Sequence, residues 1–155
     1  MKVLIQNRQR HIPLDSRRVR RAAQRILAEL ALPEAELGIL LVDDAQIQRL
    51  NREYLGRDRP TNVLSFSMRE GEFSVLHPHL LGDLVLSVET ARRQSRRFCL
   101  SSEQTVYLLM IHGILHLLGY EHEGTRKGAL EMARKQKELL CAITGKRKRS
   151  VQKAG

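Results

Sequence analysis

Hydrophobic positions along the chain follow two spacings, which together predict strands alternating with helices. Short runs rich in Val, Leu and Ile predict four strands, at residues 2–7, 37–42, 63–66 and 82–87. Longer segments repeat apolar residues at intervals of three and four, which is typical of helices. Such segments cover about 16–30, 44–54, 88–98 and 124–144, and a further one lies between Ser101 and Gly119. We expect a single domain over residues 1–145 and a frayed basic tail over 146–155.

Polar residues stand where these helices should begin. The predicted caps are Asp15 or Ser16, Asp43 or Asp44, Ser87, and Ser101, which forms a capping box with Gln104. The helix that starts after Ser101 is apolar on nearly every face, whereas the helix near the N-terminus carries arginines opposite its apolar stripe. A helix that is hydrophobic all round is a buried one. The sequence therefore predicts a central buried helix.

Charge and composition narrow the class of protein. The 27 Lys and Arg residues exceed the 17 Asp and Glu residues, for a net charge of +10. A surplus of this size favours a polyanionic partner such as nucleic acid, although any one basic cluster also fits a solvated helix face. Cys99 and Cys141 show no metal-binding or disulfide spacing, and no apolar run is long enough to span a membrane. We expect a cytoplasmic protein with reduced cysteines and no membrane partner.

The segment from His112 to His122 carries the strongest chemical signal. His112 and His116 are four residues apart, so on a helix they lie on one side and direct two imidazoles to one point. Gly119 can adopt a left-handed conformation, end the helix and allow the chain to return His122 to that point. Three imidazoles with an open fourth position are typical of a catalytic zinc site. We therefore predict one zinc ion held by His112, His116 and His122.

The residue after the first histidine restricts the reaction. Zinc proteases with this histidine spacing carry Glu there as a general base, whereas this chain has Gly113. The pattern therefore indicates a hydrolytic metal site with a substrate other than a peptide. His77 and His79 lie in an irregular loop without further ligands, and we interpret them as surface histidines.

Three segments resemble one known family. Residues 112–122 are similar to the His-Gly-x-Leu-His-Leu-x-Gly-Tyr-Asp/Glu-His signature of the YbeY-type endoribonucleases, the bacterial rRNA maturation factor family. Residues 60–66 resemble its Pro-Thr-Asp/Asn-Val-Leu-Ser-Phe signature, and residues 81–84 its Leu-Gly-Asp-Ile/Leu stretch. The segments follow the family order, and the resemblance covers the chain from Leu40 to about Met132.

The resemblance implies an α+β fold, an α/β sandwich related to the zincin metalloproteases, with a small mixed four-stranded sheet. It implies zinc on the three histidines and cleavage of single-stranded RNA. The biological roles that it implies are maturation of the 3′ end of small-subunit rRNA and ribosome quality control. We accordingly expect RNA and the ribosome or its small subunit as partners, and no DNA.

One position departs from the family pattern. Many members carry arginine directly after the tyrosine that matches Tyr54, where this chain has Leu55. Arg57 and Arg59 are the nearby candidates to neutralise charge on the phosphate. Asp83 or Glu121 could accept a hydrogen bond from a ligand histidine, and no residue stands out as the general base.

Two other functions remain open from the sequence. One is a metallopeptidase-like hydrolase with a relocated base, and the other is a ribosome assembly factor whose zinc has no catalytic role. A structural zinc site normally has four protein ligands, so an open position favours the enzyme.

Overall fold

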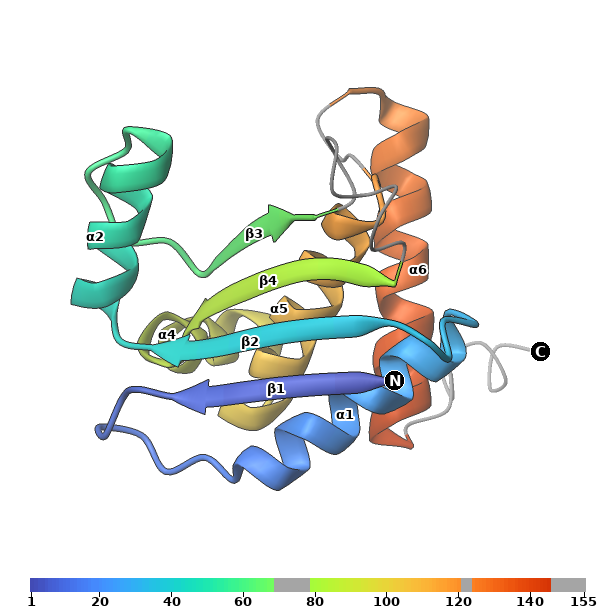
Figure 1. Ribbon diagram of the computed structural model, residues 1–155, viewed down its shortest axis with the longest axis horizontal. Coiled ribbons are helices and arrows are strands. Elements are labelled where there is room, and N and C mark those ends of the chain that lie inside the picture. The colour runs from blue at the N-terminus through green and yellow to red at the C-terminus, as the bar shows by residue number, and fades with distance from the viewer. Residues whose placement is uncertain (69–78, 121–123, 146–155) are drawn as a thin grey trace.

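The computed structural model describes residues 1–68, 79–120 and 124–145. Four strands form one mixed sheet in the order β1-β2-β4-β3 (Figure 1). The strands are β1 (Lys2–Asn7), β2 (Glu36–Val42), β3 (Val63–Ser67) and β4 (Leu80–Ser87). β1, β2 and β4 run parallel, and β3 pairs antiparallel with β4 at the edge of the sheet. All four predicted strands are confirmed, and the predicted α+β class with a small mixed sheet is correct.

Five helices accompany the sheet in the described residues. They are α1 (Ser16–Glu29), α2 (Asp44–Leu55), α4 (Val88–Phe98), α5 (Ser102–Leu117) and α6 (Arg126–Thr144). Asp15, Asp43, Ser87 and Ser101 act as N-caps for the first four, and Asp43 and Ser101 each form a full capping box. The structure thereby resolves the two open assignments in favour of Asp15 and Asp43. Each cap accepts a hydrogen bond from a backbone N–H that lacks a partner within the helix.

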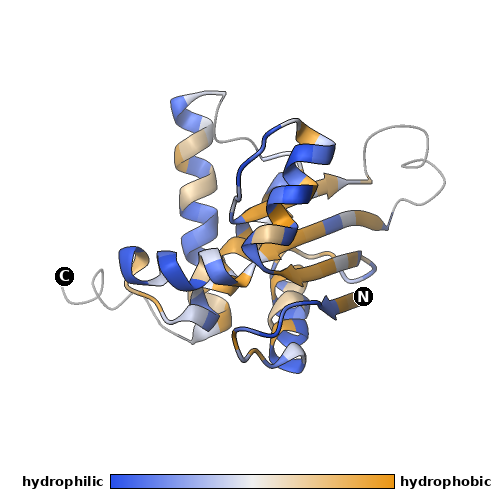
Figure 2. Cartoon of the chain, turned by 90° about the vertical axis from the view of Figure 1, so that its left-hand side faces the viewer, coloured by the Kyte–Doolittle hydropathy of each residue, from blue (hydrophilic) through white to orange (hydrophobic). Residues whose placement is uncertain are grey.

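The sheet has one covered face and one open face. α1, α4 and α5 lie behind it in Figure 1, and α5 packs against β3 and β4. Leu84 and Leu86 of β4 belong to this main core, whereas Val85, which points to the opposite face, packs with Ile47 of α2 in a smaller cluster. In Figure 2 the strands are largely hydrophobic and the outer helices carry hydrophilic stretches. Because successive side chains of a strand point to opposite faces of the sheet, Val85 lies in a different environment from Leu84 and Leu86.

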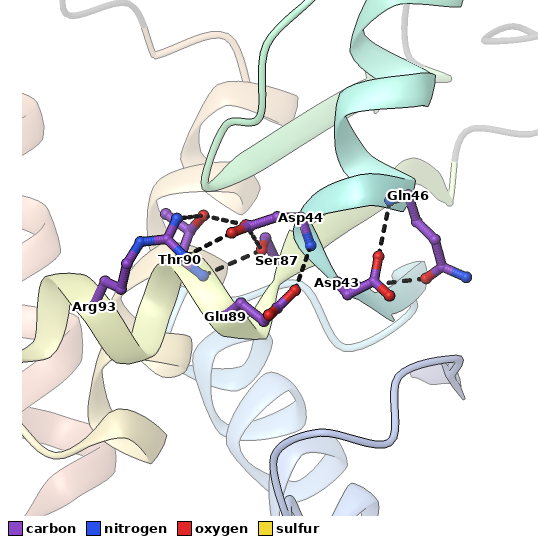
Figure 3. A network of polar contacts seen from close by, with 7 residues as sticks. All are labelled: Asp43, Asp44, Gln46, Ser87, Glu89, Thr90 and Arg93. Atoms are coloured by element: carbon purple, nitrogen blue, oxygen red, sulfur yellow. Dashed lines mark hydrogen bonds and ion pairs between the residues drawn. The ribbon is translucent and has the colours of Figure 1, made fainter.

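A polar cluster joins the start of α2 to the start of α4 (Figure 3). The Asp44 carboxylate accepts hydrogen bonds from Ser87 Oγ, Thr90 Oγ1 and Arg93 Nη1, each at 2.6 Å. The backbone N–H of Asp44 donates to Glu89 Oε1 at 2.9 Å. Burial by itself would raise the pKa of Asp44, but the bonds from Arg93, Ser87 and Thr90 outweigh it and hold that pKa below its usual value. The cluster therefore depends on an ionised Asp44.

Further sequence predictions concern membrane spans, the cysteines, two loop histidines and the C-terminal tail. Among the described helices, none combines the length and the apolar character needed to cross a lipid bilayer. Cys99 and Cys141 are free thiols, as expected. His79 is exposed, whereas His77 and the tail at 146–155 lie outside the described residues. The division into a domain at 1–145 and a tail stays a prediction.

Candidate metal centre

Helix α5 holds the two candidate ligands His112 and His116 on its C-terminal half. Ten of its sixteen residues are buried, which agrees with the prediction of a central buried helix. The Nε2 atoms of His112 and His116 lie 3.0 Å apart, and the two rings meet edge to face with centroids 4.5 Å apart. The four-residue spacing thus directs both imidazoles to one point, as predicted.

Gln136 of α6 fixes the orientation of His112. Its Oε1 lies 3.0 Å from Nδ1 of His112. An amide oxygen only accepts hydrogen bonds, so Nδ1 carries the proton, and Nε2 of the neutral ring keeps its lone pair toward His116. Metal-binding histidines are typically held in this way, through the ring nitrogen that does not bind the ion. Sequence reasoning missed Gln136, because nothing in the charged pattern of α6 distinguishes this residue.

The two histidines fit half of a tetrahedral metal site. Two nitrogens at about 2.0–2.1 Å from one tetrahedral ion lie about 3.3 Å apart, close to the separation found between the two Nε2 atoms. Two nitrogens at this distance need a proton or a cation between them. Within residues 1–68, 79–120 and 124–145, no group of three His, Cys, Asp or Glu side chains is placed to hold a metal. The third predicted ligand, His122, and Glu121 lie outside those ranges.

The C-terminal end of α5 is built to redirect the chain. Gly119 has φ +95°, and it follows the cap residue Leu118. Gly119 N–H donates to the carbonyl of His116, and Tyr120 N–H donates to that of Leu115. This pair of bonds is a Schellman motif, which satisfies the last carbonyls of a helix and turns the chain away from its axis. Gly119 thus ends the helix as predicted, whereas the return of His122 to the metal site stays a prediction.

Gly113 lies against the sheet. A Cβ added to it would lie 2.7 Å from Leu84 Cδ2 and 3.2 Å from Val63 Cγ2, both shorter than ordinary contacts. Ser65 Oγ also donates to the Gly113 carbonyl at 3.3 Å, so β3 approaches the helix backbone here. A glutamate at this position would therefore enter the core. The absence of a protease-type base at position 113 has a packing reason.

Asp83 is not placed to support the histidines. Its neighbour Leu84 faces α5, so Asp83 points to the opposite, open face of the sheet, where it is exposed. The suggestion that Asp83 accepts a hydrogen bond from a ligand histidine is wrong, and Gln136 does so for His112. Strand alternation between residues 83 and 84 is the physical reason.

Arg57 and Arg59 lie in the loop between α2 and β3, and both are exposed. Asn51 anchors this loop, since its side-chain Nδ2 donates to the Arg59 carbonyl at 3.0 Å and its backbone carbonyl accepts from the Arg57 N–H. Leu55, at the position where the family pattern often has arginine, is exposed on the last turn of α2. A role for these arginines in phosphate binding stays a prediction.

The similarity to known proteins extends over the strands and helices that form this centre. The sequence pattern of the family described as Endoribonuclease YbeY matches residues 4–144. The chain belongs to the endoribonuclease YbeY family. The YbeY endoribonuclease of Syntrophotalea carbinolica is 49% identical over 140 residues, covering 90% of this chain and 93% of the relative. That of Geobacter metallireducens is 44% identical over 144 residues, covering 92% and 96%.

The YbeY fold is also similar to a solved structure. The solution structure of TM1509 from Thermotoga maritima matches with a TM-score of 0.64 and 26% identity, covering 92% of this chain and 89% of that protein. The resemblance found in the three sequence segments is thus confirmed at the level of the family.

Proposed function

We propose that this chain is a metal-dependent endoribonuclease that cleaves single-stranded RNA, with one zinc ion held by His112, His116 and His122. The observation that carries the metal site is the 3.0 Å separation of the His112 and His116 Nε2 atoms, with Gln136 bound to the other ring nitrogen of His112. Membership of the endoribonuclease YbeY family carries the choice of RNA as substrate. The net charge of +10 supports a polyanionic substrate.

The protein side chains have separate tasks in this proposal. His112 and His116 bind the ion from a buried helix, and Gln136 keeps the His112 ring in the tautomer that a metal requires. Arg57 and Arg59 neutralise negative charge that develops on the phosphate. When bound, the zinc ion supplies Lewis-acid catalysis and lowers the pKa of water at its open position.

The family resemblance supports a proposal for the cellular substrate. We propose the 3′ end of small-subunit rRNA as the cleavage target, with the small ribosomal subunit as partner and ribosome quality control as the wider role. The packing of Gly113 against Leu84 argues against a peptidase, because the usual catalytic glutamate does not fit there. A base relocated elsewhere would leave peptide cleavage as a measurable alternative.

Cleavage of a labelled single-stranded RNA and of its duplex, assayed beside elemental analysis, tests the proposal. Wild-type protein should contain about one zinc per chain and cut the single strand. His116→Ala should lose the zinc and at least about 100-fold in rate, since even outer partners of metal ligands are worth 10–100-fold. His11→Ala is the matched control, because His11 is an exposed histidine in the β1–α1 loop, and it should behave as wild type.

Three outcomes would refute parts of the proposal. Full RNA cleavage by metal-free His116→Ala protein would remove the catalytic role of the ion. Cleavage of an unstructured protein without cleavage of RNA would assign the site to a peptidase. A bound zinc ion with neither activity would leave an assembly factor whose metal only stabilises the fold.

A further inference from the structure

A cavity of about 500 Å³ opens on the face of the sheet opposite α5. This face is toward the viewer in Figure 1, with α2 standing at one end of the strands. Gln6, Gly38 and Asp83 contribute polar and backbone surface to its floor, and Leu50 and Tyr54 of α2 form a wall. Among the described residues of the metal centre, His112, His116 and Gln136 do not line this cavity.

Large apolar side chains are exposed at this cavity. Tyr54 is 66% exposed and Leu4 is 61% exposed. Charged residues make up 28% of the chain and could have covered this surface, so the exposure of two large apolar side chains stands out. The Tyr54 ring meets the Phe66 ring edge to face, with centroids 5.5 Å apart. Phe66 therefore supports Tyr54 from the sheet and leaves much of the tyrosine open to a flat ligand. Exposed aromatic rings beside a hollow are typical of binding sites.

Asp83 is the one charged residue among the described residues that line the cavity. A Cβ at Gly38 would overlap the Asp83 Oδ1 atom, so the glycine leaves the space that this carboxylate occupies. Within the part of the chain that the structure describes, the Asp83 side chain has no hydrogen bond or ion pair. The cavity thus combines a flat apolar wall with a hydrogen-bond acceptor that has capacity for a ligand.

A nucleobase has the matching chemistry. Proteins hold single-stranded RNA by stacking unpaired bases on aromatic rings and by bonding their Watson–Crick edges. Guanine alone among the four bases presents two adjacent donors, N1–H and the N2 amino group, to a single carboxylate. We propose that the cavity is a subsite for a guanine of the single-stranded RNA substrate, with Tyr54 stacking on the base and Asp83 accepting both hydrogen bonds. The assignment of RNA rests on the proposed function.

The surrounding charge favours RNA over a basic peptide as the occupant. The segment that carries Tyr54 also carries Arg49, Arg52, Arg57 and Arg59. Over residues 49–59 the acids are Glu53 and Asp58, and the Arg52 guanidinium lies 3.7 Å from the Asp58 carboxylate. The excess of positive charge attracts the phosphates that flank a bound base and repels a peptide rich in Lys and Arg.

Titration with mononucleotides tests the subsite without any cleavage step. Full-length protein labelled with 15N would be titrated with GMP, IMP and AMP, which share the same phosphate, and the amide signals of Gly38 and Asp83 would be followed. GMP should bind about 10-fold more tightly than IMP, which lacks the N2 amino group, because hydrogen bonds to a charged acceptor are strong. Asp83→Asn should abolish the difference between GMP and IMP.

Matched variants separate the site from general effects of charge and apolar surface. Glu53→Gln removes an exposed acid next to Tyr54, and it should keep the GMP preference. Tyr54→Leu should weaken all three nucleotides about equally, by roughly 10-fold. Leu130→Ala on α6, where Leu130 is 64% exposed, should change none of them. Circular dichroism would verify that each variant is folded.

The outcomes distinguish this inference from the proposed function. If wild-type protein cleaves RNA but binds GMP and IMP equally, the guanine subsite is wrong and the endoribonuclease stands. If GMP binds as expected but no RNA is cut, the subsite stands and the enzymatic proposal fails. Binding of a Lys- and Arg-rich peptide at Gly38 and Asp83, without any GMP effect, would assign the cavity to a protein partner and overturn the inference.

Discussion

Replacement of Gln136 by Ala tests whether the His112 ring is held for a metal. The substitution removes the 3.0 Å contact between Gln136 Oε1 and His112 Nδ1, so the ring loses the partner that fixes its tautomer. Loss of such a partner typically lowers metal affinity 10–100-fold, which corresponds to about 1.4–2.8 kcal/mol. We expect Gln136→Ala to bind zinc more weakly by this factor, and Gln136→Glu, which retains an acceptor, to bind at least as tightly as wild type.

Competition with a chromogenic zinc chelator measures both affinities directly. Gln48→Ala is the matched control, because Gln48 is also a helical glutamine with one side-chain hydrogen bond, to Asp58 at 3.1 Å. This variant should leave zinc affinity unchanged, and thermal unfolding of the zinc-free proteins would reveal any general loss of stability. Equal zinc affinity of Gln136→Ala and wild type would refute the reasoning, as would equal weakening by Gln136→Ala and Gln136→Glu.

Three further predictions concern stability. Gly113→Glu should destabilise the fold by at least about 2 kcal/mol in urea unfolding, since the new side chain overlaps Leu84, and it should show no peptidase activity; a stable variant would contradict the packing argument. Asp44→Ala should lower stability at neutral pH by about 1.5–3 kcal/mol. Because the folded pKa of Asp44 is depressed, its contribution is present above about pH 4 and lost as the pH falls, so wild-type and variant stabilities should converge in acid-range urea titrations. Burial, followed by the bond to Glu103, raises the pKa of Tyr107 to about 12, so stability should fall as the pH rises from 10 to 12, and Tyr107→Phe should flatten that loss in the same assay.

Local signals in the sequence were sufficient for the elements that bear the site. Ser101 with Gln104 located the start of α5, its apolar character on all faces predicted burial, and Gly119 marked its end. Each of these signals depends on backbone hydrogen bonding or side-chain solvation within a few residues. The spacing of His112 and His116 could therefore be converted into geometry without knowledge of the tertiary structure.

The features that the sequence did not reveal depend on packing between distant segments. Gln136 reaches His112 only because α6 lies against α5, 24 residues further along the chain. Asp83 was suggested as an acceptor for a ligand histidine because the sequence does not tell which face of β4 the helix α5 covers. Gly113 likewise looked like a missing base, and its contact with Leu84 became visible only with the sheet in place.

The embedding of α5 has a consequence for the lifetime of a bound ion. This helix packs against β3, β4, α1, α4 and α6. Local unfolding of any one of these elements would therefore not expose the backbone amides of α5 to solvent. Hydrogen exchange in its middle turn should then proceed only when the whole molecule unfolds. An ion held by His112 and His116 would therefore not be released by fraying of the helix that carries these two ligands, and its loss would require either dissociation from the folded site or unfolding of the whole molecule.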